Sequence, residues 1–542
     1  MESLQCQDTS LVTLEVQKLI VRVEQGSLLG INKITSDNVG YTAFQGIPYA
    51  TPPIGELRFR DPEPPQPWND ILNAAEESYN KCIQLQQTHS SNLCKTACGR
   101  EDCLYLNIYV PHNSKRKIER RPVMVWIHGD DFISGSCMFQ RLQPDYFMDK
   151  DVIVVCITYR LGILGFLNIG HEEASGNQGL KDLVAALKWI NVNIANFTGD
   201  PNNITIFGHG SGAICAHLLM ISPMSKGLFH KAILQSGVAL CNWAVRENQP
   251  EAFQLASLMG YNFKDPVKIV TFFRELSDDE LVIKTAMVTN VKDFKMVVFG
   301  PTIDRAAKNP FLPCPIRDLI DYDNDIPVLI GHNSHEFLHF MKRDKKLLNF
   351  WTIQKNFSRH VTDLVGSNKS KIVKKMNKKI TSFFFNEQPL SRCSPLSVID
   401  CMSSIYFNIP IHTFVEIRRM RRNATTYFYI FAFSDKVTEL KQWPGTIITG
   451  PSHSDEVKYL FNNFKNKKCP KMTDSYQVMH SLTTMWSNFA RTGNPNIETK
   501  FMKTIWRPAT EDSFQFMVID HLPTTEYKTG TFQFYPFLED WY

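Results

Sequence analysis

The stretch from which the fold can be deduced is Gly199-Asp-Pro-Asn-Asn-Ile-Thr-Ile-Phe-Gly-His-Gly-Ser-Gly-Ala213. Within it, Ile204–Phe207 is a short run rich in β-branched residues, and a glycine-rich corner follows at once. Ser211–Met220, beyond the corner, has the composition of a helix. Because glycine has no Cβ, it suits a sharp turn at which two backbone segments come close together. The stretch therefore predicts a strand, a tight turn and a helix in direct succession.

This arrangement is the frame of a nucleophile elbow, whose pattern is G-x-S-x-G with the serine at the tip of the turn. The chain reads Gly208-His-Gly-Ser-Gly212, so the residue at the tip is Gly210. The frame is present, but the hydroxyl group at its tip is missing.

Other segments indicate the sheet to which this strand belongs. Val123–His128 and Val152–Tyr159 are nearly continuous apolar runs, as in strands that are covered on both faces. Apolar residues recur at helical spacing between Leu180 and Phe197. Further strands are expected at Ala232–Gln235, Pro327–Gly331 and Thr425–Phe433, two or three more within Leu19–Tyr49, and a helix at Thr483–Thr492. Alternating strands and helices predict an α/β fold with a mostly parallel sheet.

Composition excludes several classes of protein. The 542 residues are 43% hydrophobic, and the net charge of +5 is spread along the chain, which argues against a nucleic-acid partner. No apolar run approaches the ~18 residues of a transmembrane segment. The N-terminus has neither the basic nor the apolar region of a secretory signal. We therefore expect a cytoplasmic protein, or a secreted one if the N-terminus is incomplete.

The 13 cysteines include a cluster at Cys82, Cys94, Cys98 and Cys103. Their spacing lacks the tight pairs typical of structural zinc sites, so no metal is expected. In a reducing compartment most of these cysteines would be free thiols.

Motifs along nearly the whole chain, about residues 19–540, resemble those of the type-B carboxylesterase/cholinesterase family. They are Phe44-Gln-Gly-Ile-Pro-Tyr-Ala50, Gly55-Glu-Leu-Arg-Phe-Arg60, Glu101-Asp-Cys-Leu-Tyr-Leu-Asn107, Tyr159-Arg-Leu-Gly-Ile-Leu-Gly-Phe166, Gly176-Asn-Gln-Gly-Leu-Lys-Asp182, Gln235-Ser-Gly237 and Arg491-Thr-Gly-Asn-Pro495. Within the family, the chain most resembles the insect intracellular alpha-esterase branch. This resemblance rests on Pro144-Asp-Tyr-Phe-Met-Asp-Lys-Asp151 and on the absence of a visible secretory signal.

The resemblance implies an α/β-hydrolase fold: a large, mostly parallel sheet flanked by helices, with helical insertions that form a gorge-like pocket. The domain would span residues 19–542, after an N-terminal tail of residues 1–18. No cofactor is implied. Cys82 and Cys103 would correspond to a disulfide-forming pair, which need not form in a cytosolic member.

Family members hydrolyse carboxylic esters with a Ser–Glu/Asp–His triad in that chain order. Gly331-His-Asn-Ser-His-Glu-Phe337 resembles the acid-bearing loop, with Glu336 as the acid. Gly450-Pro-Ser-His-Ser-Asp-Glu-Val-Lys-Tyr459 resembles the histidine loop, with His453 as the base. Family members read G-E-S-A-G at the elbow, so Gly210 stands at the nucleophile position and His209 replaces the usual glutamate.

The oxyanion loop also departs from the family pattern. Family members read H-G-G-G-F, whereas this chain reads His128-Gly129-Asp130-Asp131-Phe132. The oxyanion position would consist of Gly129, Asp130, Asp131 and Ser211. Two aspartates add bulk and negative charge where negative charge develops during ester hydrolysis.

Four other sources of catalysis remain open. Ser211 is a displaced nucleophile if the elbow slips by one residue, but the residue after the tip enters the helix. Cys215, one turn further on, is expected to face the core. Asp131, or the Glu336–His453 pair, could activate water directly. Ser236 is the fourth candidate, but it resembles a family residue that supports the pocket wall, so a structural role is expected.

These observations favour a catalytically impaired or inactive family member that binds or sequesters a small lipophilic ester-like ligand. One alternative is a carboxylic ester hydrolase with a weak or non-standard mechanism. Another is an interaction protein with a protein partner, because the neuroligins, neurotactin and glutactin also lack the serine and serve in cell adhesion. Without a nucleophile, a buried Glu336–His453 pair still satisfies its own hydrogen bonds.

Overall fold

The computed structural model describes most of the chain. The described residues are 19–76, 81–86, 96–112, 120–138, 142–247, 249–288, 297–320, 325–343, 350–365, 370–421, 425–435, 437–439, 447–462, 473–496, 505–521 and 535. The expected tail, residues 1–18, lies outside them.

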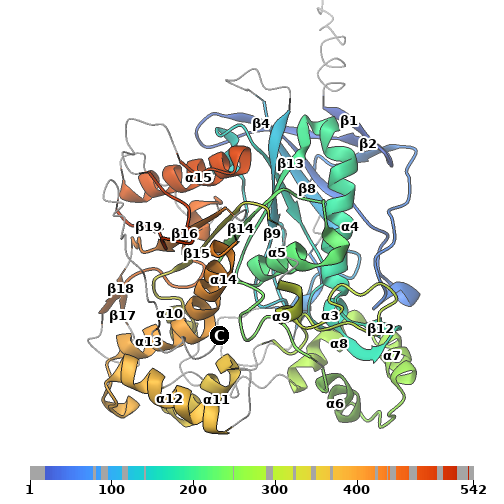
Figure 1. The fold of residues 1–542 in the computed structure, drawn as a ribbon. Coiled ribbons are helices and arrows are strands. Elements are labelled where there is room, and N and C mark those ends of the chain that lie inside the picture. Colours follow the sequence, from blue (N-terminus) through green and yellow to red (C-terminus); the bar gives the residue numbers. More distant parts are fainter. Residues whose placement is uncertain are drawn as a thin grey trace, which may run out of the picture.

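A ten-stranded sheet runs through the middle of the molecule (Figure 1). In spatial order its strands are β19 (Phe516–Ile519), β16 (Thr426–Phe431), β15 (Val328–Asn333), β14 (Lys231–Gln235), β13 (Gly199–His209), β9 (Arg121–Ile127), β10 (Ile153–Ile157), β8 (Tyr105–Pro111), β4 (Gly40–Pro48) and β3 (Ile31–Ile34). The first seven are parallel to one another, and β8, β4 and β3 extend the sheet in antiparallel pairing. The prediction of a mostly parallel sheet is confirmed.

The region Leu19–Tyr49 holds four strands, whereas two or three were expected. Two of its four strands, β1 (Ile20–Val23) and β2 (Gly26–Leu29), pair outside the main sheet. The other small pairings involve β5 (Ile71–Asn73) with β2, β6 (Gln84–Leu85) with β7 (Ala97–Cys98), β11 (Asn168–His171) with β12 (Ala174–Ser175), and β17 (Val437–Glu439) with β18 (Ile447–Thr449).

Helices cover both faces of the sheet, which explains why its central strands are apolar throughout. On β9, Val123 and Val125 belong to one hydrophobic cluster, and Met124 and Trp126 belong to the other. The helices that contribute to the first cluster include α4 (Gln178–Asn193) and α5 (Ser211–Ile221), and those of the second are α2 (Asp145–Met148) and α15 (Asp474–Thr492). The molecule is therefore built in three layers, helix on sheet on helix.

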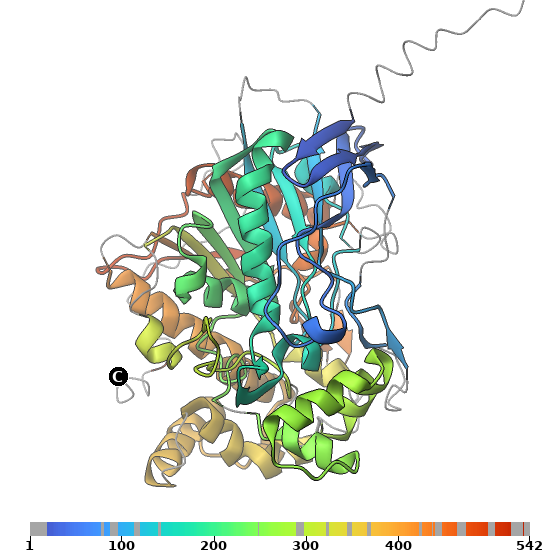
Figure 2. The same ribbon diagram turned by 90° about the vertical axis from the view of Figure 1, so that its right-hand side faces the viewer.

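Most of the remaining helices gather at one end of the sheet, at the bottom of Figures 1 and 2. They are α3 (Gly162–Phe166), α6 (Glu251–Leu258), α7 (Pro266–Glu275), α8 (Asp278–Lys284), α9 (Ile316–Leu319), α10 (Leu338–Arg343), α11 (Phe350–Val365), α12 (Ser370–Phe385) and α13 (Pro395–Ser403). The next helix, α14 (Ile409–Arg419), packs against β15 and β16 of the sheet. Between α13 and α14 the chain forms one π-helical segment, η8 (Ser404–Asn408).

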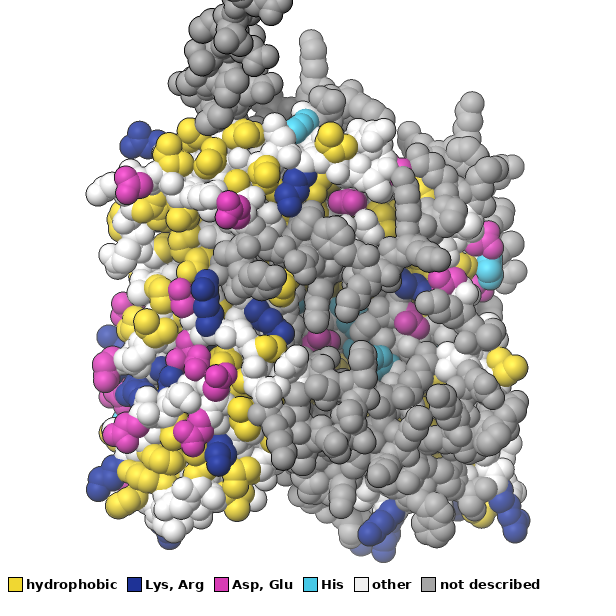
Figure 3. Space-filling model, turned by 180° about the vertical axis from the view of Figure 1, so that it is seen from behind, with side chains coloured by type: hydrophobic (Ala, Val, Ile, Leu, Met, Phe, Trp, Pro, Cys, Tyr) yellow, Lys and Arg dark blue, Asp and Glu magenta, His cyan; other side chains and the backbone are white. Residues whose placement is uncertain are grey.

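In the part of the chain that the structure describes, no helix has both the length and the apolar character needed to cross a membrane. On the described surface of the face in Figure 3, basic, acidic and hydrophobic side chains are interspersed.

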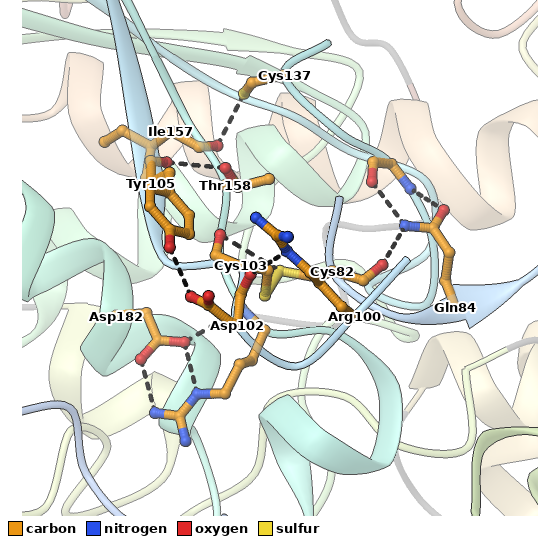
Figure 4. The surroundings of a disulfide bond; sticks show 12 residues. Cys82, Gln84, Arg100, Asp102, Cys103, Tyr105, Cys137, Ile157, Thr158 and Asp182 are labelled. Atoms are coloured by element: carbon orange, nitrogen blue, oxygen red, sulfur yellow. Dashed lines mark hydrogen bonds and ion pairs between the residues drawn. A yellow bond between two sulfur atoms is a disulfide. The ribbon is translucent and has the colours of Figure 1, made fainter. Parts of the chain in front are cut away.

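A disulfide bond joins Cys82 and Cys103, the pair that the family resemblance implies (Figure 4). Next to it, the side-chain amide of Gln84 donates to the carbonyl oxygens of Cys82 and Gly135, at 2.9 and 2.8 Å. Gly135 returns a hydrogen bond from its N–H to Oε1 of Gln84, at 2.9 Å. The disulfide is thus connected to the segment that follows Phe132.

Of the other clustered cysteines, Cys98 is a free thiol and Cys94 lies outside the described residues. Among the residues that the structure describes, no group of three or more His, Cys, Asp or Glu side chains is arranged to hold a metal ion.

We expect the double substitution Cys82→Ser with Cys103→Ser to lower the free energy of unfolding by about 3 kcal/mol, because the bond closes a loop between residues 21 apart. Urea unfolding of the oxidised protein and of the variant measures the difference. A reducing agent should lower the stability of the parent and leave that of the variant unchanged. Equal stability of the oxidised parent and the variant contradicts this prediction.

Candidate functional site

The turn between β13 and α5 has the geometry of the elbow that the sequence predicts. Gly210 has φ 56° and ψ −120°, a conformation that side chains rarely adopt. Its N–H donates to the carbonyl oxygen of Gln235, at 2.8 Å, and its carbonyl accepts from Ile214 N–H, at 3.0 Å. At Gly212 an added Cβ would lie 2.2 Å from the carbonyl oxygen of Ile127. The expected close approach of two backbone segments is therefore present.

Glu336 and His453 form a buried acid–base pair. Nδ1 of His453 lies 2.6 Å from Oε2 of Glu336, whose side chain is fully buried. The other carboxylate oxygen accepts from the hydroxyl of Ser236 and from Asn333 N–H, each at 2.6 Å. The role of Ser236 that the structure contains is thus a hydrogen bond to Glu336, and support of the pocket wall stays a prediction.

The pair controls the charge of the imidazole. Burial opposes protonation of His453, but the charge of Glu336 and the hydrogen bond to it outweigh burial, and the pKa of His453 is raised. Because Nδ1 faces a carboxylate, the neutral ring holds its proton on Nδ1 and presents Nε2 as an acceptor.

Nε2 of His453 faces the tip of the elbow. A Cβ added to Gly210 would lie 2.9 Å from Nε2 and 3.4 Å from Cε1 of the same ring. The structure therefore brings Gly210, His453 and Glu336 together in the order in which a hydroxyl, a base and an acid would act.

Ser211 lies beside this arrangement and faces away from it. Its hydroxyl oxygen accepts from the backbone N–H of Asp130, at 3.0 Å, and from that of Phe132, at 3.3 Å. The residue is 2% exposed. As expected, the residue after the tip enters α5, and its hydroxyl contacts the oxyanion loop rather than His453.

The loop from Gly129 to Phe132 adopts a strained backbone. Asp131 has φ 56° and Phe132 has φ 61°, a region that costs a bulky residue about 1–3 kcal/mol. The hydroxyl of Ser211, together with the buried ring of Phe132, holds the loop in this form. The carboxylate of Asp131 lies close enough to His453 to raise its pKa.

A second acid–base pair, which the sequence analysis missed, lies behind the first. Nε2 of His209 is 3.5 Å from Oε1 of Glu456, and the rings of His209 and His453 have their centroids 4.3 Å apart. Burial, with the neighbouring His453, lowers the pKa of His209. Burial, with the charge of Glu336, raises the pKa of Glu456 to about 7.

Glu456 is held by the amide groups of Asn333 and Gln235, at 2.6 and 3.3 Å. The sequence contained one signal that Glu456 lies near the site: it follows His453 by three residues, within the stretch Gly450–Tyr459 that resembles the histidine loop.

Aromatic rings form the apolar side of the site. The ring centroid of Phe407, in η8, is 4.8 Å from that of His453, and Phe340, in α10, is at 6.0 Å. Phe407 in turn contacts Trp243, at 5.8 Å, and Trp243 contacts Phe132, at 6.4 Å. The predicted gorge itself stays a prediction, whereas this aromatic wall is part of the described structure.

Cys215 is remote from the chemistry, as expected. It is fully buried in the core, 3.9 Å from the hydroxyl of Tyr159, and burial raises the pKa of its thiol to about 12. A thiol in this state is a poor nucleophile.

Comparison with known proteins agrees with the fold. The juvenile hormone esterase of Manduca sexta, solved with OTFP covalently attached, superimposes with a TM-score of 0.83 at 25% identity, over 96% of this chain and 98% of that one. The chain is an α/β-hydrolase. The sequence model of the Carboxylesterase family matches residues 17–535. The protein therefore belongs to the carboxylesterase family.

Several similar proteins are named esterases. Esterase E4 of Myzus persicae is 32% identical over 527 residues, which cover 93% of this chain and 92% of that protein. The juvenile hormone esterase of Tribolium castaneum is 32% identical over 508 residues, covering 88% and 84%. The liver carboxylesterase of Sus scrofa is 32% identical over 510 residues, covering 88% and 86%.

We expect Glu336→Gln to lower the pKa of His453, because the substitution removes the charge that outweighs burial. An NMR titration of the histidine ring measures the shift. In the parent, the stability gained from this pair is full below the unfolded pKa of 6.5 and is lost as the pH rises through the higher folded pKa.

Asp474→Asn is the matched control, because Asp474 pairs with His521 at the surface. It should leave the pKa of His453 unchanged. A pKa of His453 that stays the same in Glu336→Gln contradicts the assignment.

Proposed function

We propose that this carboxylesterase-family protein binds a small lipophilic ester-like ligand and hydrolyses esters poorly or not at all. Gly210 stands where catalytic members carry the nucleophilic serine. The observation that carries the proposal is the position of Gly210: the base faces a residue that has no side-chain atom. Loss of the serine from a comparable triad lowers turnover by on the order of 10⁶.

The oxyanion loop supports the same proposal. The N–H of Asp130 already has an acceptor in Ser211, so it is engaged before any ligand arrives. The charge of Asp131 opposes a developing oxyanion near His453. Removal of one oxyanion donor lowers turnover by roughly 10²–10³. The substitutions at the elbow and in the loop thus impair the same chemical step.

Binding does not depend on the missing hydroxyl. Ligand sites are mostly apolar, with a few polar groups that orient the ligand. The aromatic wall of Phe407, Phe340 and Trp243 next to His453 has this character. Sequestering or carrying a lipophilic molecule is therefore the role that we propose, and a cytoplasmic location is part of this proposal.

A weak hydrolase is the second candidate, because the Glu336–His453 pair is intact and Nε2 faces Gly210, which has no side chain. Such a pair can act as a general base toward water, an effect worth typically 10²–10⁴. A role in protein interaction, as in the adhesion relatives, rests on the family analogy alone.

We expect the purified protein to resist labelling by a fluorophosphonate probe and to hydrolyse aryl esters on the order of 10⁶ more slowly than an active family member. In-gel fluorescence and an absorbance assay measure the two outcomes. Ser211→Ala is the control, because it removes any signal that arises from the adjacent hydroxyl. Strong labelling with turnover would reject the proposal.

We expect the triple variant Gly210→Ser, Asp130→Gly, Asp131→Gly to gain aryl esterase activity. The serine would place its Oγ beside Nε2 of His453, and the glycines would remove the charge and bulk in the oxyanion loop. The same variant with His453→Ala is the control and should lose the gain. A folded triple variant without activity would show that the scaffold, and not only its nucleophile, is unfit for hydrolysis.

A further inference from the structure

The geometry points to a hydroxyl-binding position between Gly210 and His453, through which this protein selects lipophilic alcohols over the corresponding esters. The inference rests on one part of the proposed function, that a lipophilic ligand binds beside His453, and it names an alcohol rather than an ester as the ligand that binds more tightly.

The position is defined by the missing side chain of Gly210. Among the residues that the structure describes, and beyond the chain neighbours of Gly210, the atoms within 4 Å of a Cβ built on this residue are Nε2 and Cε1 of His453. The side chain of His453 is 12% exposed, and its Nδ1 is bound to Glu336, so within the described part of the chain Nε2 is the ring nitrogen that can bind a ligand.

A hydroxyl group matches this nitrogen in both of its states. In the neutral ring Nε2 accepts a hydrogen bond, and in the charged ring it donates one. An alcohol donates and accepts, whereas an ester or ether oxygen only accepts. The environment of His453 includes the carboxyl groups of Glu336, Glu456 and Asp131, which raise its pKa, and the neighbouring ring of His209. A ligand carboxylate would face these same negative charges.

The oxyanion loop disfavours the competing group, an ester carbonyl. Ser211 already accepts the N–H groups of Asp130 and Phe132, so a carbonyl oxygen that approaches the loop must displace an intramolecular hydrogen bond. The carboxylate of Asp131 adds a charge that repels the partial negative charge of the carbonyl oxygen. Nε2 of the neutral His453 ring therefore accepts a hydrogen bond from an alcohol, whereas the oxyanion loop weakens the binding of an ester carbonyl.

Apolar rings lie where the rest of such a ligand would extend. Phe407 and Phe340 contact the ring of His453, and Trp243 and Phe132 continue the wall. Phe407 is 2% exposed and Phe340 is 6% exposed, so both rings belong to the packed structure. An alkyl chain against this wall and a hydroxyl on Nε2 satisfy both parts of the site.

The test compares 1-octanol, methyl octyl ether, ethyl octanoate and sodium octanoate by calorimetry with the full chain. At a pH above the raised pKa of His453, where the ring is neutral and Nε2 only accepts, we expect 1-octanol to bind about fivefold to tenfold more tightly than the ether, the difference that one hydrogen bond makes. The ¹⁵N resonance of Nε2 in His453 should shift on addition of 1-octanol and stay in place on addition of the ether.

Gly210→Ala fills the position with a methyl group and should reduce the affinity for 1-octanol to that for the ether. Gly227→Ala is the matched control: Gly227 has φ 80°, also in the left-handed region, and an added Cβ there has no atom of the described residues within 4 Å. It should leave the preference for the alcohol intact. If Gly210→Ala fails to fold, His453→Asn tests the same point, because the amide N–H replaces the Nδ1 donor to Glu336 and Nε2 is removed.

Equal affinities for alcohol, ether and ester, with no effect of Gly210→Ala, would overturn the inference and leave the binding function standing. Tighter binding of the octanoate than of the alcohol would overturn the inference as well. Absence of binding by all four compounds would overturn the proposed function and the inference together.

Discussion

The close approach of the β13–α5 turn to the end of β9 is the constraint on which the site depends. A Cβ on Gly129 would lie 2.2 Å from the carbonyl oxygen of His209, and one on Gly212 equally close to that of Ile127. Only glycine allows such contact between two backbones. The contact fixes the distance between the elbow and the oxyanion loop, and it brings the hydroxyl of Ser211 within reach of the N–H groups of that loop.

The buried polar groups around His453 stabilise one another without any ligand. Glu336 accepts hydrogen bonds from Ser236, Asn333 and His453, and Asn333 also binds Glu456. A buried carboxylate is costly unless it is paired and hydrogen-bonded, and this network satisfies that requirement. The acid–base pair therefore has a structural reason to persist in a protein whose elbow bears no nucleophile.

His209 alters the electrostatics of the same network. Its pKa is lowered by burial and by His453, so the neutral ring lies between His453 and the carboxyl of Glu456. A glutamate, the usual family residue here, would have added a third buried acid to Glu336 and Glu456. The histidine instead places a neutral polar group beside Glu456, whose own pKa is raised to about 7.

The sequence by itself determined the sheet and the elbow, and it predicted the pairing of Glu336 with His453 that the structure contains. Strands buried on both faces are apolar throughout, the turn needs glycines, and the Glu336 and His453 loops carry family motifs, so each is a local signal. Only the tertiary structure decided where the hydroxyl of Ser211 points and that His209 meets Glu456. Those contacts join segments far apart in the chain, and they depend on side-chain direction and burial, which no local pattern specifies.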